Sequence, residues 1–153
     1  MTPLSPSQKN VLRVRTAIFS LILIVFALIA EVAIPGDLEL PTGIILGLAL
    51  VASFLLIFLL PDRRYRAWGY DETADELQVQ HGIWVRRRTI VPFGRVQHID
   101  VSQGPIERHY RIGTLTLHTA GTRSSAVALP GLDLDQAERM RDEIRGKIRQ
   151  DLV

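Results

Sequence analysis

The pattern of apolar and polar positions changes at about residue 61. Two apolar runs, residues 16–34 and 42–60, come before it, and the only ionised side chain within them is Glu31. Each run has 19 residues. As a helix rising ~1.5 Å per residue, such a run nearly spans the ~30 Å hydrocarbon layer of a bilayer. The pattern therefore predicts a transmembrane helical hairpin over residues 16–60, preceded by a short N-terminal segment, residues 1–15.

After this hairpin, apolar positions alternate with polar ones, as in strands that pack one face on a core and leave the other in water. We expect strands over residues 76–80, 83–91, 95–101, 114–120 and 126–130. Acidic residues 71–75 favour a turn, and Pro92 and Gly94 end the second strand. The side chains expected to face the core are Leu77, Val79, Ile83, Val85, Val91, Ile99, Val101, Leu115, Leu117, Thr119, Val127 and Leu129.

The C-terminal segment changes to a helical period and carries one apolar stripe, formed by Ala137, Met140, Ile144 and Ile148. Asp133 and Gln136 at its start resemble a capping box. Six or seven short strands followed by one amphipathic helix predict a mainly antiparallel β domain over residues 61–153. We expect a bent sheet or a partly open barrel, capped by the C-terminal α-helix.

Basic residues flank the two apolar runs, whereas the linker between them is acidic. The flanks carry Lys9, Arg13, Arg15, Arg63, Arg64 and Arg66, and the linker 35–41 carries Asp37 and Glu39 without Lys or Arg. By the positive-inside rule, both termini and the β domain are expected in the cytoplasm. The small-residue pattern at 30–33 also imitates a signal-peptide cleavage site. The length of the first run and the second run directly after it favour a retained span.

Gly43 and Gly47 form a GxxxG match at the start of the second apolar run. Two helix backbones can approach closely at such a pair because glycine has no side chain. One interpretation is packing against the first helix or a partner chain. The other is the ordinary frequency of glycine in membrane helices.

Several short motifs follow one another along the β domain. They are Pro92, Arg95-Val96-Gln97, Gln103-Gly104-Pro105 with Arg108, and Thr119-Ala120-Gly121. Together with the two apolar runs, they resemble the bacterial membrane-flanked PH-like domain family (YdbS-like proteins), over roughly residues 15–150. Residues 109–113 depart from the apolar run that this family more often carries.

The resemblance implies a PH-like fold, which is a strongly bent antiparallel sheet capped by one helix, and it implies no established activity. It also implies a place in the bacterial cytoplasmic membrane as a multi-pass protein. Proteins similar to this family often accompany a larger relative with several such domains. A homo-oligomer, or a hetero-oligomer with a related multi-domain membrane protein, is therefore expected.

The sequence offers little support for catalysis. The chain has no cysteine and no phosphate loop or nucleophile elbow, and metal-binding spacing is absent from its histidines, His81, His98, His109 and His118. His98, Asp100 and Ser102 share one strand face and supply an enzymatic hypothesis kept only as a control. A net charge of +2 without an aromatic and basic platform argues against nucleic acid. We expect no enzyme activity, no cofactor and no metal.

Arginine is the remaining signal. Alternation sends Arg87 to one strand face and its neighbours Arg86 and Arg88 to the other. Arg87 is expected near a barrel mouth or an edge, where it either binds a ligand or guards against edge-to-edge pairing. The candidates for ligand or partner binding are Arg87, Arg95, Arg108 and Arg111, with the last two in loops. At the membrane surface, we expect Arg63, Arg64 and Arg66, each either attracting anionic lipid by ~1 kcal/mol or only setting topology.

Two functions fit this sequence. In the first, a non-enzymatic integral membrane protein displays the PH-like domain at the inner membrane surface for protein–protein contact or self-assembly, in envelope stress or in support of transport. In the alternative, the domain senses anionic lipid headgroups through Arg87, Arg95 or Arg108. Membrane lipids are partners in both.

Overall fold

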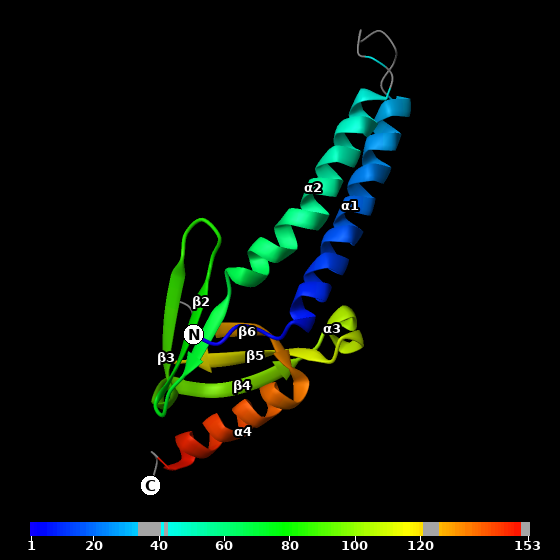
Figure 1. The fold of residues 1–153 in the computed structure, drawn as a ribbon. Coiled ribbons are helices and arrows are strands. Elements are labelled where there is room, and N and C mark those ends of the chain that lie inside the picture. The colour runs from blue at the N-terminus through cyan, green and yellow to red at the C-terminus, as the bar shows by residue number, and fades with distance from the viewer. Residues whose placement is uncertain (34–40, 42, 121–125, 151–153) are drawn as a thin grey trace.

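The computed structural model describes residues 1–33, 41, 43–120 and 126–150. Helices α1 (Ser7–Ala33) and α2 (Ile44–Arg66) lie side by side and project from one end of a β domain (Figure 1). Both are long and apolar enough to cross a membrane, and large apolar side chains such as Phe26 and Phe58 are exposed on them. The predicted pair of apolar helices is confirmed. Both helices extend toward the domain beyond the predicted limits of 16 and 60.

Small side chains form the contact between α1 and α2. The buried residues along the middle of this pair are Thr16, Ser20, Ala27, Ala49 and Ser53. Gly47 is exposed, and a Cβ placed on it would meet no atom within 4 Å, while Gly43 precedes α2 with φ of +90°. Gly47 therefore does not pack against the first helix, whereas the Gly43 amide donates a hydrogen bond to the Glu31 side chain of α1. Contact with a partner chain stays a prediction.

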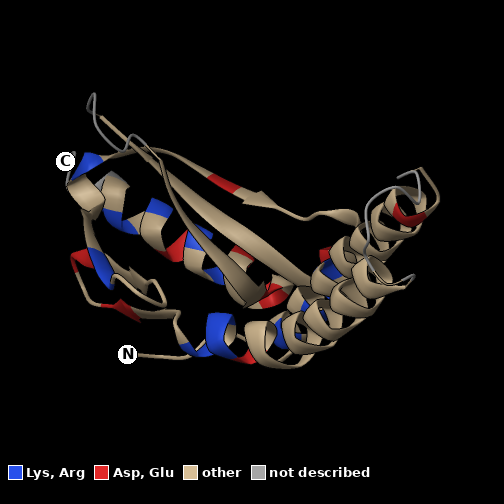
Figure 2. Cartoon of the chain, turned by 90° about the horizontal axis from the view of Figure 1, so that it is seen from above, with Lys and Arg blue, Asp and Glu red and all other residues tan. Residues whose placement is uncertain are grey.

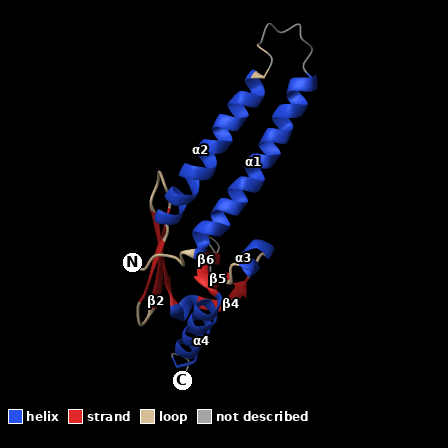
Figure 3. Cartoon of the chain, turned by 45° about the vertical axis from the view of Figure 1, so that its right-hand side comes forward, coloured by secondary structure: helices blue, strands red, loops and turns tan. Residues whose placement is uncertain are grey.

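The β domain consists of two three-stranded antiparallel sheets that are not closed into a barrel (Figure 3). The first contains β1 (Gly69–Glu72), β2 (Glu76–His81) and β3 (Arg87–Pro92). The second contains β4 (Val96–Ser102), β5 (Ile112–Thr119) and β6 (Ala126–Asp133). The 3-10 turn η1 (Phe93–Arg95) joins the sheets, α3 (Pro105–His109) connects β4 to β5, and α4 (Leu134–Gln150) follows β6.

One core lies between the two sheets and α4. Its side chains alternate along the strands as predicted, with Leu77, Val79, Val91, Leu115, Leu117 and Leu129 buried. Ala137, Met140 and Ile144 of α4 are buried against them, and Ile148 packs at the margin. The predicted apolar stripe of the C-terminal helix is thus confirmed, because burial of this stripe is what holds the helix on the sheets.

The first six residues belong to the β domain rather than to a separate segment. Thr2 pairs with Tyr70 at the free edge of β1, and Leu4 is buried in the core. The Ser5 amide donates to the carbonyl of Gly131, 2.8 Å away. Gly131 has φ of +75°, and a Cβ there would lie 2.6 Å from the side chain of Gln8. The approach of α1 to β6 therefore requires glycine at this position.

Two further contacts fix the domain relative to the helices. The Tyr65 hydroxyl at the end of α2 donates to the Leu4 carbonyl at 2.8 Å. Arg15 of α1 pairs with the buried Glu107 of α3, with 2.9 Å between guanidinium nitrogen and carboxylate oxygen. The domain is therefore held by both helices.

The predicted strand over residues 83–91 was wrong in its first half. β3 begins at Arg87, and Ile83 and Val85 are exposed instead of facing the core. The reason is Gly82, whose φ of +119° ends β2 and starts a loop that connects β2 to β3. At the other end of β2, the predicted turn over residues 71–75 is shorter, since Asp71 and Glu72 belong to β1 and pair with β2.

Two helix ends also differ from prediction. Asp133 accepts a hydrogen bond from Ser5, and Gln136 donates to the Tyr70 hydroxyl, so both side chains of the expected capping box bond elsewhere. Burial, the larger influence, raises the pKa of Tyr70, and the bond from Gln136 acts in the opposite direction. Arg108, expected in a loop, lies on α3, which starts with a proline and is capped by Glu107 bonding back to the Gly104 amide.

Candidate functional site

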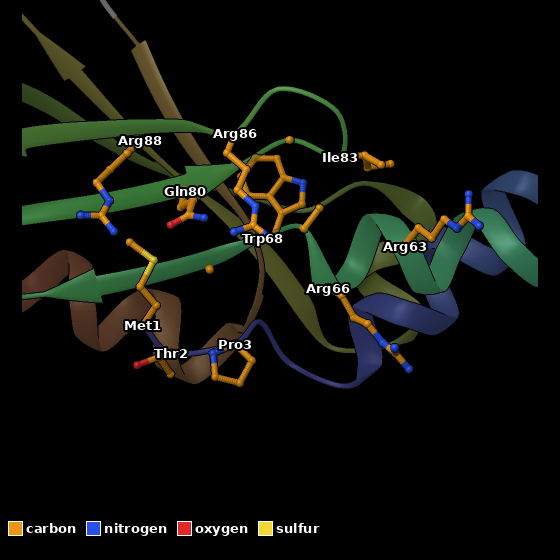
Figure 4. Close-up of a pocket in the computed structure, with 13 residues that line it drawn as sticks. Met1, Thr2, Pro3, Arg63, Arg66, Trp68, Gln80, Ile83, Arg86 and Arg88 are labelled. Atoms are coloured by element: carbon orange, nitrogen blue, oxygen red, sulfur yellow. The ribbon is translucent and has the colours of Figure 1, made fainter.

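A cleft of about 680 Å³ lies where α2 ends and the chain enters the first sheet (Figure 4). Three segments form its walls: the N-terminal residues, the junction of α2 with β1, and the β2–β3 hairpin. The lining residues are Met1, Thr2, Pro3, Arg63, Arg66, Ala67, Trp68, Gly69, Gln80, Gly82, Ile83, Arg86 and Arg88. Its volume is in the range typical of small-molecule sites.

Helical and strand periodicity place four arginines on this cleft. Arg63 and Arg66 are three positions apart in the last turns of α2, so they share one side of the helix. Arg88 of β3 and Arg86, which directly precedes that strand, both line the cleft from the hairpin. Arg88 pairs in register with Gln80 of β2. The two pairs come from segments that are remote in sequence and line the same cleft, with the side chains of Arg63 and Arg66 extending away from each other at its edge (Figure 4).

Electrostatics distinguishes these arginines from other cations near the helices. Lys9 and Arg13 pair with Asp62 at 2.9 and 3.6 Å, and Arg15 pairs with Glu107. Among the described residues, no carboxylate lies within 4 Å of any of the four cleft arginines, and none lines the cleft. Figure 2 shows the Lys and Arg residues gathered on the domain and on the helix ends beside it, while the spans are nearly uncharged. The cleft therefore has an excess of positive charge, although Asp62 of α2 interacts with Arg66 at longer range.

An aromatic wall completes the cleft. The Trp68 ring stacks on His81 of β2, with 4.9 Å between centroids and 23° between planes. Guanidinium groups offer several N–H donors each and bind phosphate or carboxylate through paired, charge-assisted hydrogen bonds. The lining residues include no His, Asp, Glu or Cys, the usual acid–base or nucleophilic groups. The arrangement is suited to holding an anion rather than to transforming one.

The structure does not bring the four predicted arginines together. Arg87 lies on β3 with its side chain on the face opposite Arg88, Arg95 ends η1, and Arg108 is on α3. Arg111 has φ of 53° and lines a separate hollow with Asp133, Leu134 and Asp135. Of the three predicted membrane-surface arginines, Arg63 and Arg66 line the cleft and Arg64 does not.

Sequence reasoning missed Arg86, Arg88, Gln80 and Trp68 as site residues. The alternation that separates Arg87 from its neighbours was visible in the sequence, and Arg86 and Arg88 line the cleft while Arg87 does not. Periodicity alone did not say which face of the strand borders a cavity.

The cluster of His98, Asp100 and Ser102, the enzymatic hypothesis kept as a control, is assembled on the second sheet differently from the prediction. Asp100 bridges two imidazoles, with 2.8 Å to His98 Nε2 and 3.1 Å to His118 Nε2. Ser102 instead pairs in register with Thr114. All three members of the observed cluster are substantially exposed, with side chains 69%, 52% and 41% accessible for His98, Asp100 and His118. A water-exposed cluster of this kind lacks the enclosure in which acid–base groups are normally tuned.

Comparisons with known proteins show which family the chain is similar to. A family model described as Bacterial PH domain matches residues 14–148. The chain is 38% identical over 103 residues to the UPF0699 transmembrane protein YdbS of Bacillus subtilis (strain 168), covering 67% of this chain and 63% of YdbS. It is 24% identical over 105 residues to the UPF0699 transmembrane protein YdbT of the same organism, covering 68% of this chain and 21% of YdbT. The chain thus spans less than two thirds of YdbS, and no solved structure matches significantly.

Proposed function

The chain belongs to the bacterial PH domain family, and from this premise we propose that it is a non-enzymatic membrane protein whose cationic cleft binds the phosphate of an anionic lipid headgroup. The observation that carries the proposal is the set of four cleft arginines without a carboxylate partner among the described residues, at the point where α2 leaves the membrane. The function is headgroup recognition by an anchored domain.

The helices make weak binding sufficient. Because α1 and α2 hold the cleft at the membrane surface, a headgroup meets it at a high effective concentration, as in any tethered interaction. Each basic residue near an anionic surface contributes ~1 kcal/mol. Paired hydrogen bonds from guanidinium to phosphate add selectivity for the headgroup that the surface charge alone does not provide.

The orientation follows from the charge pattern of the flanks. Arg63 and Arg64 directly after the second span, and the acidic linker before it, favour a hairpin with both termini in the cytoplasm. The cleft then faces the inner leaflet of the cytoplasmic membrane, and the anionic lipids of that leaflet are its proposed ligands. Assembly with another chain stays a prediction from the family resemblance.

The first prediction tests the cleft with matched charge removal. We expect the full-length chain, extracted in mild detergent from membranes that contain equal amounts of zwitterionic and anionic lipid, to co-purify with an excess of anionic lipid. The Arg86→Gln/Arg88→Gln variant should reduce that excess about tenfold, corresponding to ~1.4 kcal/mol. Mass spectrometry of the bound lipid measures the ratio.

The control is Arg87→Gln/Arg95→Gln, which removes the same charge from positions outside the cleft. It should leave the excess of anionic lipid nearly unchanged. Equal losses in both double variants would show that the domain responds only to net charge, and would refute the cleft as the site. Raising the ionic strength during extraction should weaken the wild-type excess, because salt screens exposed charges.

A further inference from the structure

The loop that connects β2 to β3 carries an exposed apolar tip. Ile83, Trp84 and Val85 are 40%, 92% and 71% exposed. Among the described residues outside α1 and α2, the only other exposed large apolar side chains are Met1 and Ile90. Three consecutive apolar residues at one loop are a concentrated patch, and such patches mark interaction sites in folded proteins.

The tip points in the direction of the spanning helices. Figures 1 and 3 both show the β2–β3 hairpin projecting beside α2, on the side of the domain from which the two helices extend. The turn at the opposite end of β2, Thr73 to Asp75, is polar and exposed. The two ends of the same strand therefore differ in chemistry, with the apolar end on the membrane side.

We propose that Ile83, Trp84 and Val85 insert into the interfacial layer of the leaflet that faces the domain. Tryptophan is enriched at this depth because its ring is apolar and its N–H is polar. Arg86 then lies at headgroup level, where a long basic side chain keeps its charge in water while its stem contacts lipid. The inference goes beyond headgroup binding, since it assigns a second membrane contact that uses no charge recognition.

The position of the tip favours a lipid over a protein partner. It lies alongside α2 (Figure 1), which exposes Phe54, Leu55 and Phe58, each at least 49% accessible, and these side chains need a hydrocarbon environment. The adjacent wall of the cleft carries Arg63 and Arg86, which complement an anionic headgroup layer. The apolar tip matches the boundary of the acyl chains, and the arginines next to it match the headgroup layer, which is the order of these layers in a leaflet.

The local backbone supports a fixed tip. Gly82 has φ of +119°, and a Cβ there would overlap the carbonyl oxygen of Val85, so the chain folds back tightly at this point. Trp84 is thereby presented at the end of a short loop between paired strands. Membrane insertion then requires no unfolding of the sheet.

The second prediction uses the two tryptophans of the chain, Trp68 and Trp84. The Trp68→Phe variant leaves Trp84 as the sole tryptophan, and Trp84→Phe leaves Trp68. In full-length protein in phosphatidylcholine nanodiscs, Trp84 should emit at shorter wavelength than a water-exposed indole. Lipid brominated near the top of the acyl chains should quench it at least twofold. Trp68, stacked on His81, should be quenched much less.

A second measurement keeps the test independent of the Trp68→Phe variant. Because the chain has no cysteine, Trp84→Cys and Ala74→Cys can each carry one environment-sensitive fluorophore. The label at 84 should report an apolar environment in nanodiscs, and the label at 74, on the polar turn, should report water. Solvent-like emission from the label at 84, with ready quenching by aqueous iodide, would overturn the proposal. Burial of that label in cells but not in nanodiscs would also overturn it, because the tip would then contact a protein and not lipid.

The use of zwitterionic lipid separates this inference from the proposed function. Loss of anionic-lipid enrichment with an inserted Trp84 would refute headgroup binding alone. Enrichment with a solvent-exposed Trp84 would refute insertion alone.

Discussion

Gly82 illustrates how a single residue determines the shape of the membrane-facing end of the domain. Its positive φ and the nearby Val85 carbonyl exclude a side chain. We predict that Gly82→Ala destabilises the full-length chain by more than ~1 kcal/mol, the approximate cost of a left-handed residue with a Cβ. Thermal unfolding in detergent micelles, followed by circular dichroism of the sheet, measures the change.

The matched substitution is Gly146→Ala on α4. A Cβ at Gly146 would meet no atom within 4 Å, and its φ is not positive. Alanine there should stabilise the chain by about 0.5–1 kcal/mol, since glycine in a helix is entropically unfavourable. If both alanine variants shifted the melting temperature in the same direction, the steric argument at Gly82 would be wrong.

At the scale of elements, α3 connects the domain to α1 through one buried carboxylate. Glu107 accepts from the Gly104 amide at 2.7 Å and pairs with Arg15 at 2.9 Å. We predict that Glu107→Gln keeps the bond within α3 but weakens the link to α1 by about 1–2 kcal/mol, because a charge-assisted bond is lost. Faster hydrogen exchange in α3, with α4 unchanged, is the expected readout.

The exposed pair Arg141–Asp142 on α4 provides the comparison. Its nitrogen and oxygen are also 2.9 Å apart, but the Asp142 side chain is 63% accessible. Asp142→Asn should change hydrogen exchange very little, because solvent-exposed ion pairs contribute little to stability. An equal effect of both substitutions would contradict the importance of burial at Glu107.

At the scale of the whole molecule, the cleft and the tip both depend on which leaflet faces the domain. Single cysteines can report this, since the chain has none of its own. We predict that Pro41→Cys, in the linker between the spans, reacts with a membrane-impermeant thiol reagent in intact cells. Ala74→Cys, in the β domain, should react only after the cells are opened. Labelling of position 74 in intact cells would reverse the orientation proposed from the flanking charges.

The sequence determined those features that depend on local periodicity. In a hydrocarbon layer, the backbone N–H and C=O groups of a long apolar run all find hydrogen-bond partners within the run only if it is helical. Alternation fixed the inward faces of β2, β4 and β5. The three- and four-residue spacing of Ala137, Met140 and Ile144 fixed the buried side of α4. Alternation also separated Arg87 from Arg86 and Arg88. These properties follow from neighbours within one element, so they can be deduced without knowing the fold.

Tertiary structure decided what depends on contacts between distant residues. Ser5 and Tyr70 engage the side chains that sequence spacing assigned to a helix cap, and Gly82 converts the first half of an expected strand into a loop. The cleft exists because the β2–β3 hairpin folds back beside the end of α2, which brings Arg86 and Arg88 to Arg63 and Arg66. No local pattern encodes that meeting, because it depends on how β1 pairs with β2 and on the angle at which α2 enters the sheet.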